Sequence, residues 1–200
     1  MQAEIEVRFL HVDYDDLRQK LRKAGARQEH AMKAMKRVII DYPDQRLQQE
    51  QGGWGFIRLR DEGDKIFLTY KLFSEDNKTG AHEIEIEVSS YDKTIEFFEA
   101  IGLKVISEQH TKRELWRLDK CDVSLDQWPW LPPMVEIEGP SEKQLQLVAK
   151  KLGLKWAEFI SGNAVVAYRK MYPGMNENDS IREVPKLTFE EMPQWLKDRQ

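Results

Sequence analysis

The chain has 200 residues, of which 40% are hydrophobic, and this is enough to bury a core as one globular domain. Its 35 acidic residues outnumber the 31 basic ones and give a net charge of −4, which argues against sequence-independent nucleic-acid binding. The single cysteine excludes an internal disulfide, and no stretch has the length and apolarity of a signal peptide or a membrane span, so a reducing cytoplasm without a membrane partner is expected.

The first elements in chain order are a strand, a helix and a second strand. Residues 3–10 alternate charged and apolar side chains, which predicts a half-buried strand. Asp13 is a suitable N-cap for the helix that follows, and Gly25 is suited to end that helix. The β-branched run at residues 36–42 then predicts another strand.

The middle of the chain predicts a long loop, a hairpin and a further strand. Residues 47–55 are polar and rich in glycine, which favours a loop. Two short strands, at residues 56–60 and 66–71, flank a turn that contains a glycine, as is typical of a hairpin. After a polar loop, residues 83–88 predict a strand with acidic side chains on one face.

One unit occurs three times along the chain: an acidic strand, a polar N-cap, an amphipathic helix and a terminating glycine. The three copies span residues 4–25, 85–102 and 136–153. In the third copy, Ser141 and Gln144 have the spacing of a capping box. Another candidate strand follows each glycine, near Arg27, Val105 and Trp156. Residues 111–118 and 122–126 alternate in a way that predicts a second hairpin.

Charged side chains recur on one face of nearly every predicted strand. Eight strands can close into a barrel with an enclosed lumen. If the apolar faces pack under the helices, the charged faces line that lumen. An open antiparallel sheet with its charged face in water is the alternative, and the pattern alone does not decide between the two.

A charged lumen indicates a particular chemistry. Carboxylates within about 4–6 Å of one another disfavour ionisation unless a cation is present, and Mg²⁺ or Mn²⁺ prefers carboxylate oxygens. Guanidinium groups bind phosphate oxygens in bidentate fashion, and lysine acts as a point charge. Acidic groups with a metal ion on one side, and basic groups on the other, would form a polyphosphate site. The acidic candidates are Glu4, Glu6, Glu136 and Glu138, and the basic candidates are Arg8, Arg58, Arg60, Lys71 and Arg113.

Residues 171–200 are the least determined part of the chain. A short helix is predicted to begin near Pro193, and it could close one end of a barrel, cover a barrel edge or mediate a dimer. Arg169 and Lys170 are candidates for an additional phosphate contact. The cluster around Trp128 and Trp130 could stack a base, but its prolines favour a rigid connection before the last acidic strand.

At these residues the chain resembles the CYTH family, or triphosphate tunnel metalloenzymes, which includes class IV adenylyl cyclases and thiamine and inorganic triphosphatases. Glu4-Ile5-Glu6-Val7-Arg8 stands where the family has Glu-x-Glu-x-Lys, with arginine in place of lysine. Further matches follow in the family's order, at Arg58-Leu59-Arg60, Leu68-Thr69-Tyr70-Lys71, Lys112-Arg113, Asp126 and Val135-Glu136-Ile137-Glu138. Arginine preserves phosphate binding but, unlike lysine, cannot readily accept a proton.

The resemblance implies an α+β fold in which an eight-stranded antiparallel β-barrel forms a triphosphate tunnel, with helices packed outside. The tunnel domain would span residues 1–170, with residues 171–200 as a tail of the same domain. The implied metal ligands are Glu4, Glu6, Glu85, Glu87, Asp126, Glu136 and Glu138. The implied phosphate-binding residues are Arg8, Arg58, Arg60, Lys71 and Arg113. Candidates for a catalytic role are Glu4, Glu6 and Lys71.

Three functions follow as expectations from this resemblance. The first is a triphosphatase dependent on Mg²⁺ or Mn²⁺ and acting on tripolyphosphate or a nucleoside or thiamine triphosphate. The second is a class IV adenylyl cyclase, whose bacterial members tend to carry a His-Phe pair before their first glutamates, where this chain has only three residues. The third is a non-catalytic module that binds a polyphosphorylated ligand. The expected partner is a small-molecule triphosphate, and the protein would be a monomer or a homodimer.

Overall fold

The computed structural model describes residues 5–49, 53–74 and 82–200. The elements, where η marks a short 3-10 helix, are β1 (Ile5–Leu10), α1 (Tyr14–Lys23), β2 (Arg27–Asp41), η1 (Arg46–Gln49), β3 (Gly53–Asp61), β4 (Ile66–Ser74), β5 (His82–Val88), α2 (Tyr91–Ala100), β6 (Lys104–Leu118), β7 (Cys121–Gln127), β8 (Met134–Gly139), α3 (Glu142–Lys151), η2 (Trp156–Glu158), β9 (Ile160–Ser161), α4 (Ala164–Met171), η3 (Ile181–Glu183), β10 (Lys186–Leu187) and α5 (Gln194–Lys197). Within these ranges, we find no helix with the length and apolarity needed to cross a membrane.

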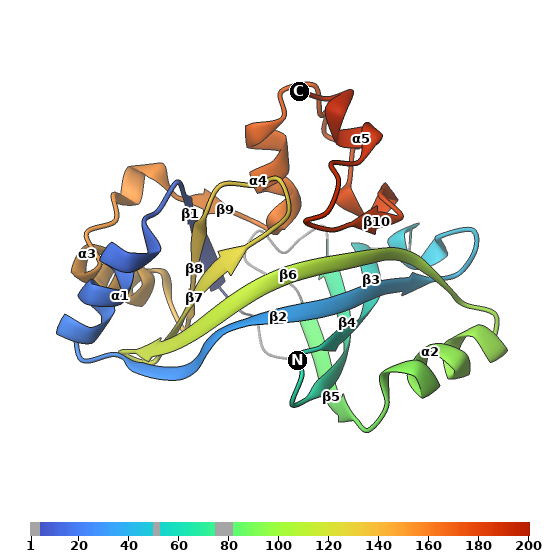
Figure 1. The fold of residues 1–200 in the computed structure, drawn as a ribbon, viewed down its shortest axis with the longest axis horizontal. Coiled ribbons are helices and arrows are strands. Elements are labelled where there is room, and N and C mark those ends of the chain that lie inside the picture. The colour runs from blue at the N-terminus through green and yellow to red at the C-terminus, as the bar shows by residue number, and fades with distance from the viewer. Residues whose placement is uncertain (1–4, 50–52, 75–81) are drawn as a thin grey trace.

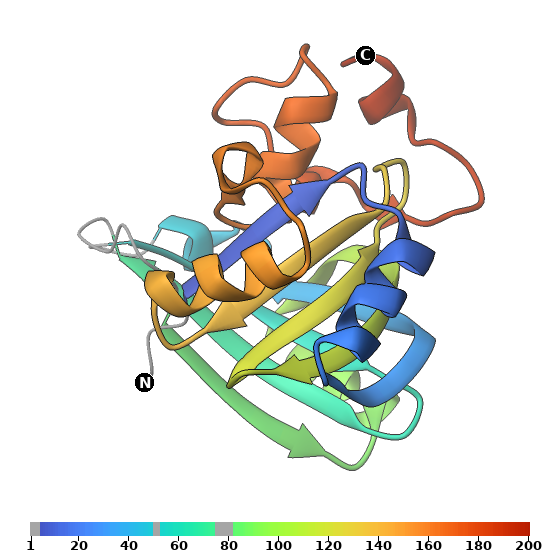
Figure 2. The same cartoon turned by 90° about the vertical axis from the view of Figure 1, so that its left-hand side faces the viewer.

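The strands form one curled sheet, in which β1 to β8 are the long members. The hydrogen-bonded order is β5-β4-β3-β2-β6-β7-β8-β1-β9, with antiparallel neighbours throughout, and β10 adds a parallel pair with β6. Figures 1 and 2 show the sheet bending around its inner face with helices α1, α2 and α3 outside. The predicted α+β tunnel architecture is confirmed. In the part of the chain that the structure describes, β5 and β9 end the order, so the sheet curls without closing its hydrogen-bonded ring.

The three predicted strand–helix units are all present. Each helix begins at an N-cap residue, Asp13, Ser90 or Ser141, whose side chain accepts a hydrogen bond from a backbone N–H group of the first helical turn. The glycine after each helix has a positive φ, of +79° at Gly25, +95° at Gly102 and +70° at Gly153. The predicted capping box in the third unit is only half formed. The Gln144 backbone N–H donates to Ser141, but the Gln144 side chain donates to the carbonyl of Asp119 instead.

The helices cover the apolar outer face of the sheet. Helices α1 and α3 bury Leu17, Leu21, Leu145 and Val148 in a cluster with outward residues of β1, β6, β7 and β8. Helix α2 packs Ile95 and Phe98 against a second cluster built on β2 and β3. Because side chains alternate along a strand, burying one face under helices leaves the intervening charged positions on the inner face.

Several elements differ from the predicted ones. The candidate strand near Arg27 and the strand at 36–42 form one strand, β2, and the candidate strand near Val105 is continuous with 111–118 in β6. These strands pair with each other along almost their whole length, through three irregularities. The loop predicted at 47–55 contains part of η1 and the start of β3, and residues 50–52 lie outside the described part. The strand expected near Trp156 is a 3-10 helix followed by the two-residue β9, and α4 was not predicted.

The C-terminal residues pack on the end of the sheet. Leu187 of β10 and Leu196 of α5 are buried with Met134 and Tyr168 in a third apolar cluster. Strand β10 pairs with residues 108–109 of β6, beyond the part of β6 that pairs with β7. The tail thus extends the sheet where β7 ends, and the predicted helix near Pro193 is present as α5. The division at residue 170 stays a prediction.

Candidate active site

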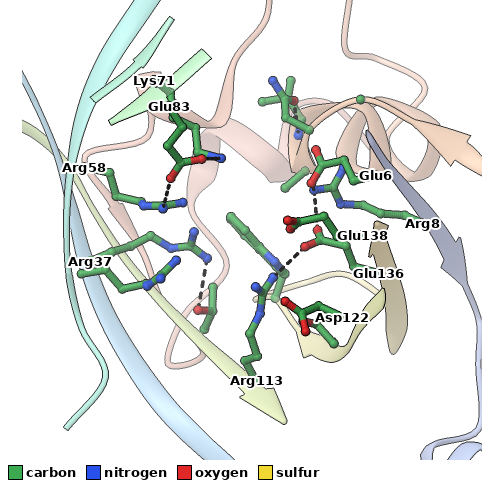
Figure 3. Close-up of a pocket in the computed structure, with 18 of the residues that line it drawn as sticks. Glu6, Arg8, Arg37, Arg58, Lys71, Glu83, Arg113, Asp122, Glu136 and Glu138 are labelled. Carbon is green, nitrogen blue, oxygen red and sulfur yellow. Dashed lines mark hydrogen bonds and ion pairs between the residues drawn. The ribbon is translucent and has the colours of Figure 1, made fainter. Parts of the chain in front are cut away.

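The inner face of the sheet encloses a cavity of about 830 Å³. Side chains from β1, β2, β3, β4, β5, β6, β7 and β8 line it, together with the start of α4 and η3. Figure 3 shows charged side chains converging on this space from opposite walls. The charged strand faces therefore line a cavity, as the barrel hypothesis requires, and do not form the outer surface of a flat sheet.

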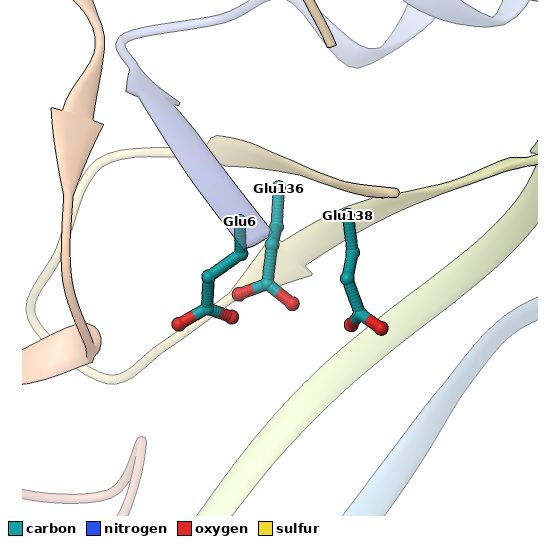
Figure 4. A group of neighbouring side chains, drawn as sticks. All are labelled: Glu6, Glu136 and Glu138. Atoms are coloured by element: carbon teal, nitrogen blue, oxygen red, sulfur yellow. The ribbon is translucent and has the colours of Figure 1, made fainter. Parts of the chain in front are cut away.

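Acidic side chains gather where β1 and β8 pair. Glu6 lies opposite Glu138, and Arg8 lies opposite Glu136, in antiparallel register. Positions two apart on a strand share a face, so all four side chains point to the same side. One carboxylate oxygen from each of Glu6, Glu136 and Glu138 lies within 4.8 Å of the other two (Figure 4). We call these three residues the acidic cluster.

Two arginines contact the acidic cluster, and the pKa values of its members are shifted in different directions. Arg8 Nη2 lies 2.5 Å from Glu136 Oε2 and 3.0 Å from Glu6 Oε2, and Arg113 Nη2 lies 3.1 Å from Glu136 Oε1. Burial alone would raise the pKa of Glu136, but Arg8 and Arg113 outweigh it and hold that pKa at about 2. At Glu6, burial and the charge of Glu136 outweigh Arg8 and raise the pKa. The cluster and Asp126 together place four carboxyl groups around these two arginines, so acidic groups outnumber basic ones there.

The opposite wall is basic and comes from β3, β4 and β5. Arg58 Nη2 lies 3.1 Å from Thr69 Oγ1 and 3.3 Å from carboxylate oxygens of both Glu83 and Glu85. Lys71 Nζ lies 2.6 Å from Glu83 Oε2. These ion pairs hold Arg58 and Lys71 side by side at the cavity surface (Figure 3). The predicted phosphate-binding residues of β3 and β4 are thus brought together.

Arg37 of β2 joins this wall and was not among the predicted site residues. It lies opposite Arg60 in the β2–β3 pair, and its guanidinium carbon lies 4.1 Å from the ring centroid of Trp128. Burial and the charges of Arg58, Arg60 and Arg113 lower the pKa of Arg37. Burial and Arg58 likewise lower the pKa of Arg60 to about 10. Mutual repulsion of this kind marks a place suited to an anion.

The acidic residues of β5 lie away from the acidic cluster. Glu85 accepts a 2.7 Å hydrogen bond from Thr69 and lies within ion-pair distance of Arg58 and Arg60, so it belongs to the basic wall. Glu87 is exposed, pairs with Lys65 at 3.0 Å and does not line the cavity. The structure therefore does not bring these two predicted metal ligands to the other three.

Two further predicted acids differ in their surroundings. Asp126 is buried and accepts Arg113 in bidentate fashion at 2.5 and 2.6 Å, so it orients Arg113 and is not part of the acidic cluster. Glu4 lies outside the described residues. Asp122, which was not predicted, lines the cavity beside Glu138 in the β7–β8 register and pairs with Arg117 at 2.9 Å.

The acidic cluster fits a hard divalent cation. Carboxylate oxygens are the ligands that Mg²⁺ and Mn²⁺ prefer, and the donors of Glu6, Glu136 and Glu138 already lie close together. Burial is the largest cause of the raised pKa of Glu6, and a bound cation would offset that cost of burial. These three residues would therefore hold the ion.

The C-terminal segment also reaches the cavity. Arg182 of η3 is 9% exposed and lines the cavity, with its guanidinium carbon 4.4 Å from the ring centroid of Phe56. Burial and Arg169 lower the pKa of Arg182 to about 10. Arg169 donates to the carbonyls of Glu177 and Asp179 at 2.5 and 2.7 Å, so it holds this loop against the end of α4. Arg169 and Lys170, the candidates for an additional phosphate contact, do not line the cavity.

Comparison with known proteins agrees with this architecture. A provisionally named adenylate cyclase of Methanocaldococcus jannaschii is 29% identical over 84 residues, which cover 41% of this chain and 47% of that relative. The match thus spans about half of the relative's length.

Two solved structures show the same fold. A provisionally named adenylate cyclase of Vibrio parahaemolyticus has a TM-score of 0.70 at 15% identity, with 81% of this chain and 95% of that chain covered. A Hippeastrum protein, described as a provisional adenylyl cyclase with a dominant triphosphatase activity, has a TM-score of 0.54 at 14% identity, with 82% and 92% covered. The CYTH domain matches residues 2–159. The chain therefore belongs to the CYTH domain family.

Proposed function

We propose that this protein is a divalent-metal-dependent triphosphatase that releases phosphate from tripolyphosphate or from a nucleoside or thiamine triphosphate. The observation that carries the proposal is the opposition of two walls across one cavity of about 830 Å³. One wall has the acidic cluster, in which one oxygen of each carboxylate lies within 4.8 Å of the others, and the other wall has arginines whose pKa values are lowered by burial and by one another. A polyphosphate anion with a bound cation complements both walls at once.

The arginines would hold and orient the phosphate groups. Guanidinium groups donate in a planar fork that matches two phosphate oxygens, and Arg37, Arg58 and Arg60 lie together on one wall. Arg113 lies between the walls, fixed by Asp126 and Glu136. Holding the substrate at several points lowers the entropy cost of reaching the reactive geometry. These donors also offset the negative charge on the phosphoryl oxygens in the transition state.

Glu6, Glu136 and Glu138 would hold the divalent ion beside the bound phosphates. When bound, such an ion supplies Lewis-acid polarisation of phosphoryl oxygens and lowers the pKa of water. Lys71 lies on the opposite wall and can offset charge on the leaving phosphate oxygen as a point cation. The curled sheet limits bulk water around these groups, which strengthens their electrostatic effect.

An adenylyl cyclase is the second candidate. The relatives from Methanocaldococcus and Vibrio are provisionally named as such enzymes. Trp156 and Phe159 line the cavity with ring centroids 4.7 Å apart, and aromatic rings of this kind can stack against a purine base. This activity would release pyrophosphate and cyclic AMP, whereas the triphosphatase would release orthophosphate.

Product analysis tests the proposal. The purified protein would be incubated with Mg²⁺ or Mn²⁺ and, separately, with tripolyphosphate, ATP or thiamine triphosphate, and the products would be separated chromatographically. We expect orthophosphate to be released, and we expect its release to stop when a chelator is added. Cyclic AMP and pyrophosphate would instead select the cyclase, and tight binding without any product would select a non-catalytic binding module.

A neighbouring pair of residues gives a matched control for the basic wall. Arg37 points into the cavity, whereas Lys36 lies on the outer face near the ring of Tyr91. Each substitution by glutamine removes one positive charge from the same strand. We expect Arg37→Gln to raise KM for the triphosphate by about tenfold or more, the equivalent of one good charge-assisted contact. Lys36→Gln should leave KM unchanged, and equal effects of the two changes would contradict the assignment of this wall.

A further inference from the structure

Arg8 places a positive charge inside the acidic cluster, where a metal ion would bind. It lies on β1 directly opposite Glu136 and two residues after Glu6, with its side chain directed into the acidic cluster (Figure 3). Only 6% of Arg8 is exposed. One nitrogen, Nη2, contacts both carboxylates, at 2.5 Å from Glu136 and 3.0 Å from Glu6. A guanidinium held in this way offsets the negative charge of two carboxylates, as a bound metal ion would.

Arg8 and Arg113 already contact several of the carboxylate oxygens that a metal ion would use. Arg8 contacts Oε2 of Glu136 and Arg113 contacts Oε1, so both oxygens of Glu136 already have a cationic partner. Glu6 has one oxygen in contact with Arg8. Glu136 is thus paired with arginine through both of its oxygens, and Glu6 through one. One more cation fits such a cluster better than two.

The rest of the Arg8 side chain adds to this picture. Its Nε and Nη1 atoms are buried and have no hydrogen-bond partner among the described residues. Buried N–H groups without a partner are costly, so these atoms are suited to donate to a ligand or water that reaches them. Arginine has enough donors to keep its contacts with the carboxylates while its other nitrogens donate to a phosphate oxygen.

We propose that Arg8 acts as a built-in cation of the acidic cluster, so that the protein binds a single divalent ion there, in competition with Arg8. The inference rests on the metal site of the proposed function but does not depend on turnover. It also gives a consequence of the positive charge at residue 8: this charge lowers the affinity of the free protein for metal.

Titration of the substrate-free protein with Mn²⁺, followed by calorimetry and by the electron paramagnetic resonance of free Mn²⁺, tests the inference. The wild-type protein should bind one ion. Arg8→Gln frees oxygens of Glu6 and Glu136 and removes a competing charge, so it should bind the first ion about tenfold or more tightly and should admit a second. Arg8→Lys keeps a cation that has fewer donors and should give an intermediate affinity.

Lys71→Gln is the matched control, because Lys71 acts on Glu6 and Glu136 through space but contacts neither of them. It should change Mn²⁺ affinity much less than Arg8→Gln. Thermal melting would first establish that each variant is folded, and Arg8→Lys would carry the test if Arg8→Gln does not fold. Two ions bound to the wild type, unchanged affinity in the folded Arg8 variant, or equal tightening in Lys71→Gln would each overturn the inference. Loss of triphosphatase activity would not affect it.

Discussion

At the scale of single residues, the cavity shows how neighbouring groups shift the pKa values of two identical side chains in opposite directions. Glu6 and Glu136 are both glutamates of the acidic cluster and share Arg8 as a partner. Glu136 has a second arginine, Arg113, and its pKa falls to about 2, whereas the pKa of Glu6 rises because burial dominates there. The number of cationic contacts, and not residue type, therefore separates the pKa values of the two carboxyl groups.

Glu136→Gln should destabilise the metal-free protein in a pH-dependent way. A carboxylate whose pKa falls from 4.5 to about 2 on folding contributes stability above pH 4.5, and this contribution is lost as the pH falls through about 2. A shift of this size corresponds to roughly 3 kcal/mol. In urea unfolding with a chelator present, we expect a gap of this order at pH 7 that narrows below pH 4.5.

The exposed Glu96 on α2 gives the control for this change. Among the residues that the structure describes, Glu96 pairs only with Lys93 at the surface, so Glu96→Gln should stay within about 0.5 kcal/mol of the wild type at every pH. A gap between wild type and Glu136→Gln that is the same at pH 7 and pH 3 would show that the Glu136 charge does not contribute as described.

At the scale of elements, short sequence motifs predicted the helix ends, which depend on neighbouring residues. The caps at Asp13, Ser90 and Ser141 and the glycines after the helices were found from their own neighbourhoods, because capping depends on adjacent backbone groups. The full length of β2 was not found, because its first half is held by pairing with the distant β6 and passes through irregularities that disturb the alternation. Arg37 was missed for a related reason. Alternation alone does not say whether Lys36 or Arg37 faces inward.

The tail shows the same limit, and it leads to a prediction about α5. Leu196 is fully buried although its helix has only four residues, so tertiary packing and not helix propensity holds α5 in place. Leu196→Ala should lower the free energy of unfolding by about 2 to 5 kcal/mol, as expected for a large buried side chain. The exposed Leu147 on α3 is the matched control, and Leu147→Ala should cost less than about 0.5 kcal/mol.

The shape of the unfolding curve matters as much as the midpoint in that experiment. If the tail and the curled sheet form one domain, Leu196→Ala should shift a single cooperative transition. A separate early transition, with the main one unchanged, would show that residues 171–200 fold independently of the sheet.

At the scale of the whole molecule, the net charge of −4 does not reveal that acidic and basic groups gather on two opposite walls of one cavity. The family resemblance at Glu6, Arg58, Lys71 and Glu138 predicted which strands would carry these charges. The sequence could not reveal that Glu85 pairs with the arginines of its own wall, or that Arg182 enters the cavity from the tail, because both depend on how the sheet curls. The division of the cavity into two walls is thus a property of the folded chain.

Because the two walls lie on parts of the sheet joined through β2, β6 and β7, a ligand that contacts both walls should stiffen the molecule as a unit. We expect a non-hydrolysable triphosphate analogue with Mg²⁺ to slow amide hydrogen exchange in β1 and β8 and also in β3, β4 and β5. At a concentration about 100 times its Kd, such a ligand stabilises the folded state by about 2.7 kcal/mol. Orthophosphate, which is too short to bridge the walls, should protect β3 and β4 but not β1 and β8. Protection by the analogue that stays on one wall would show that the substrate does not span the cavity.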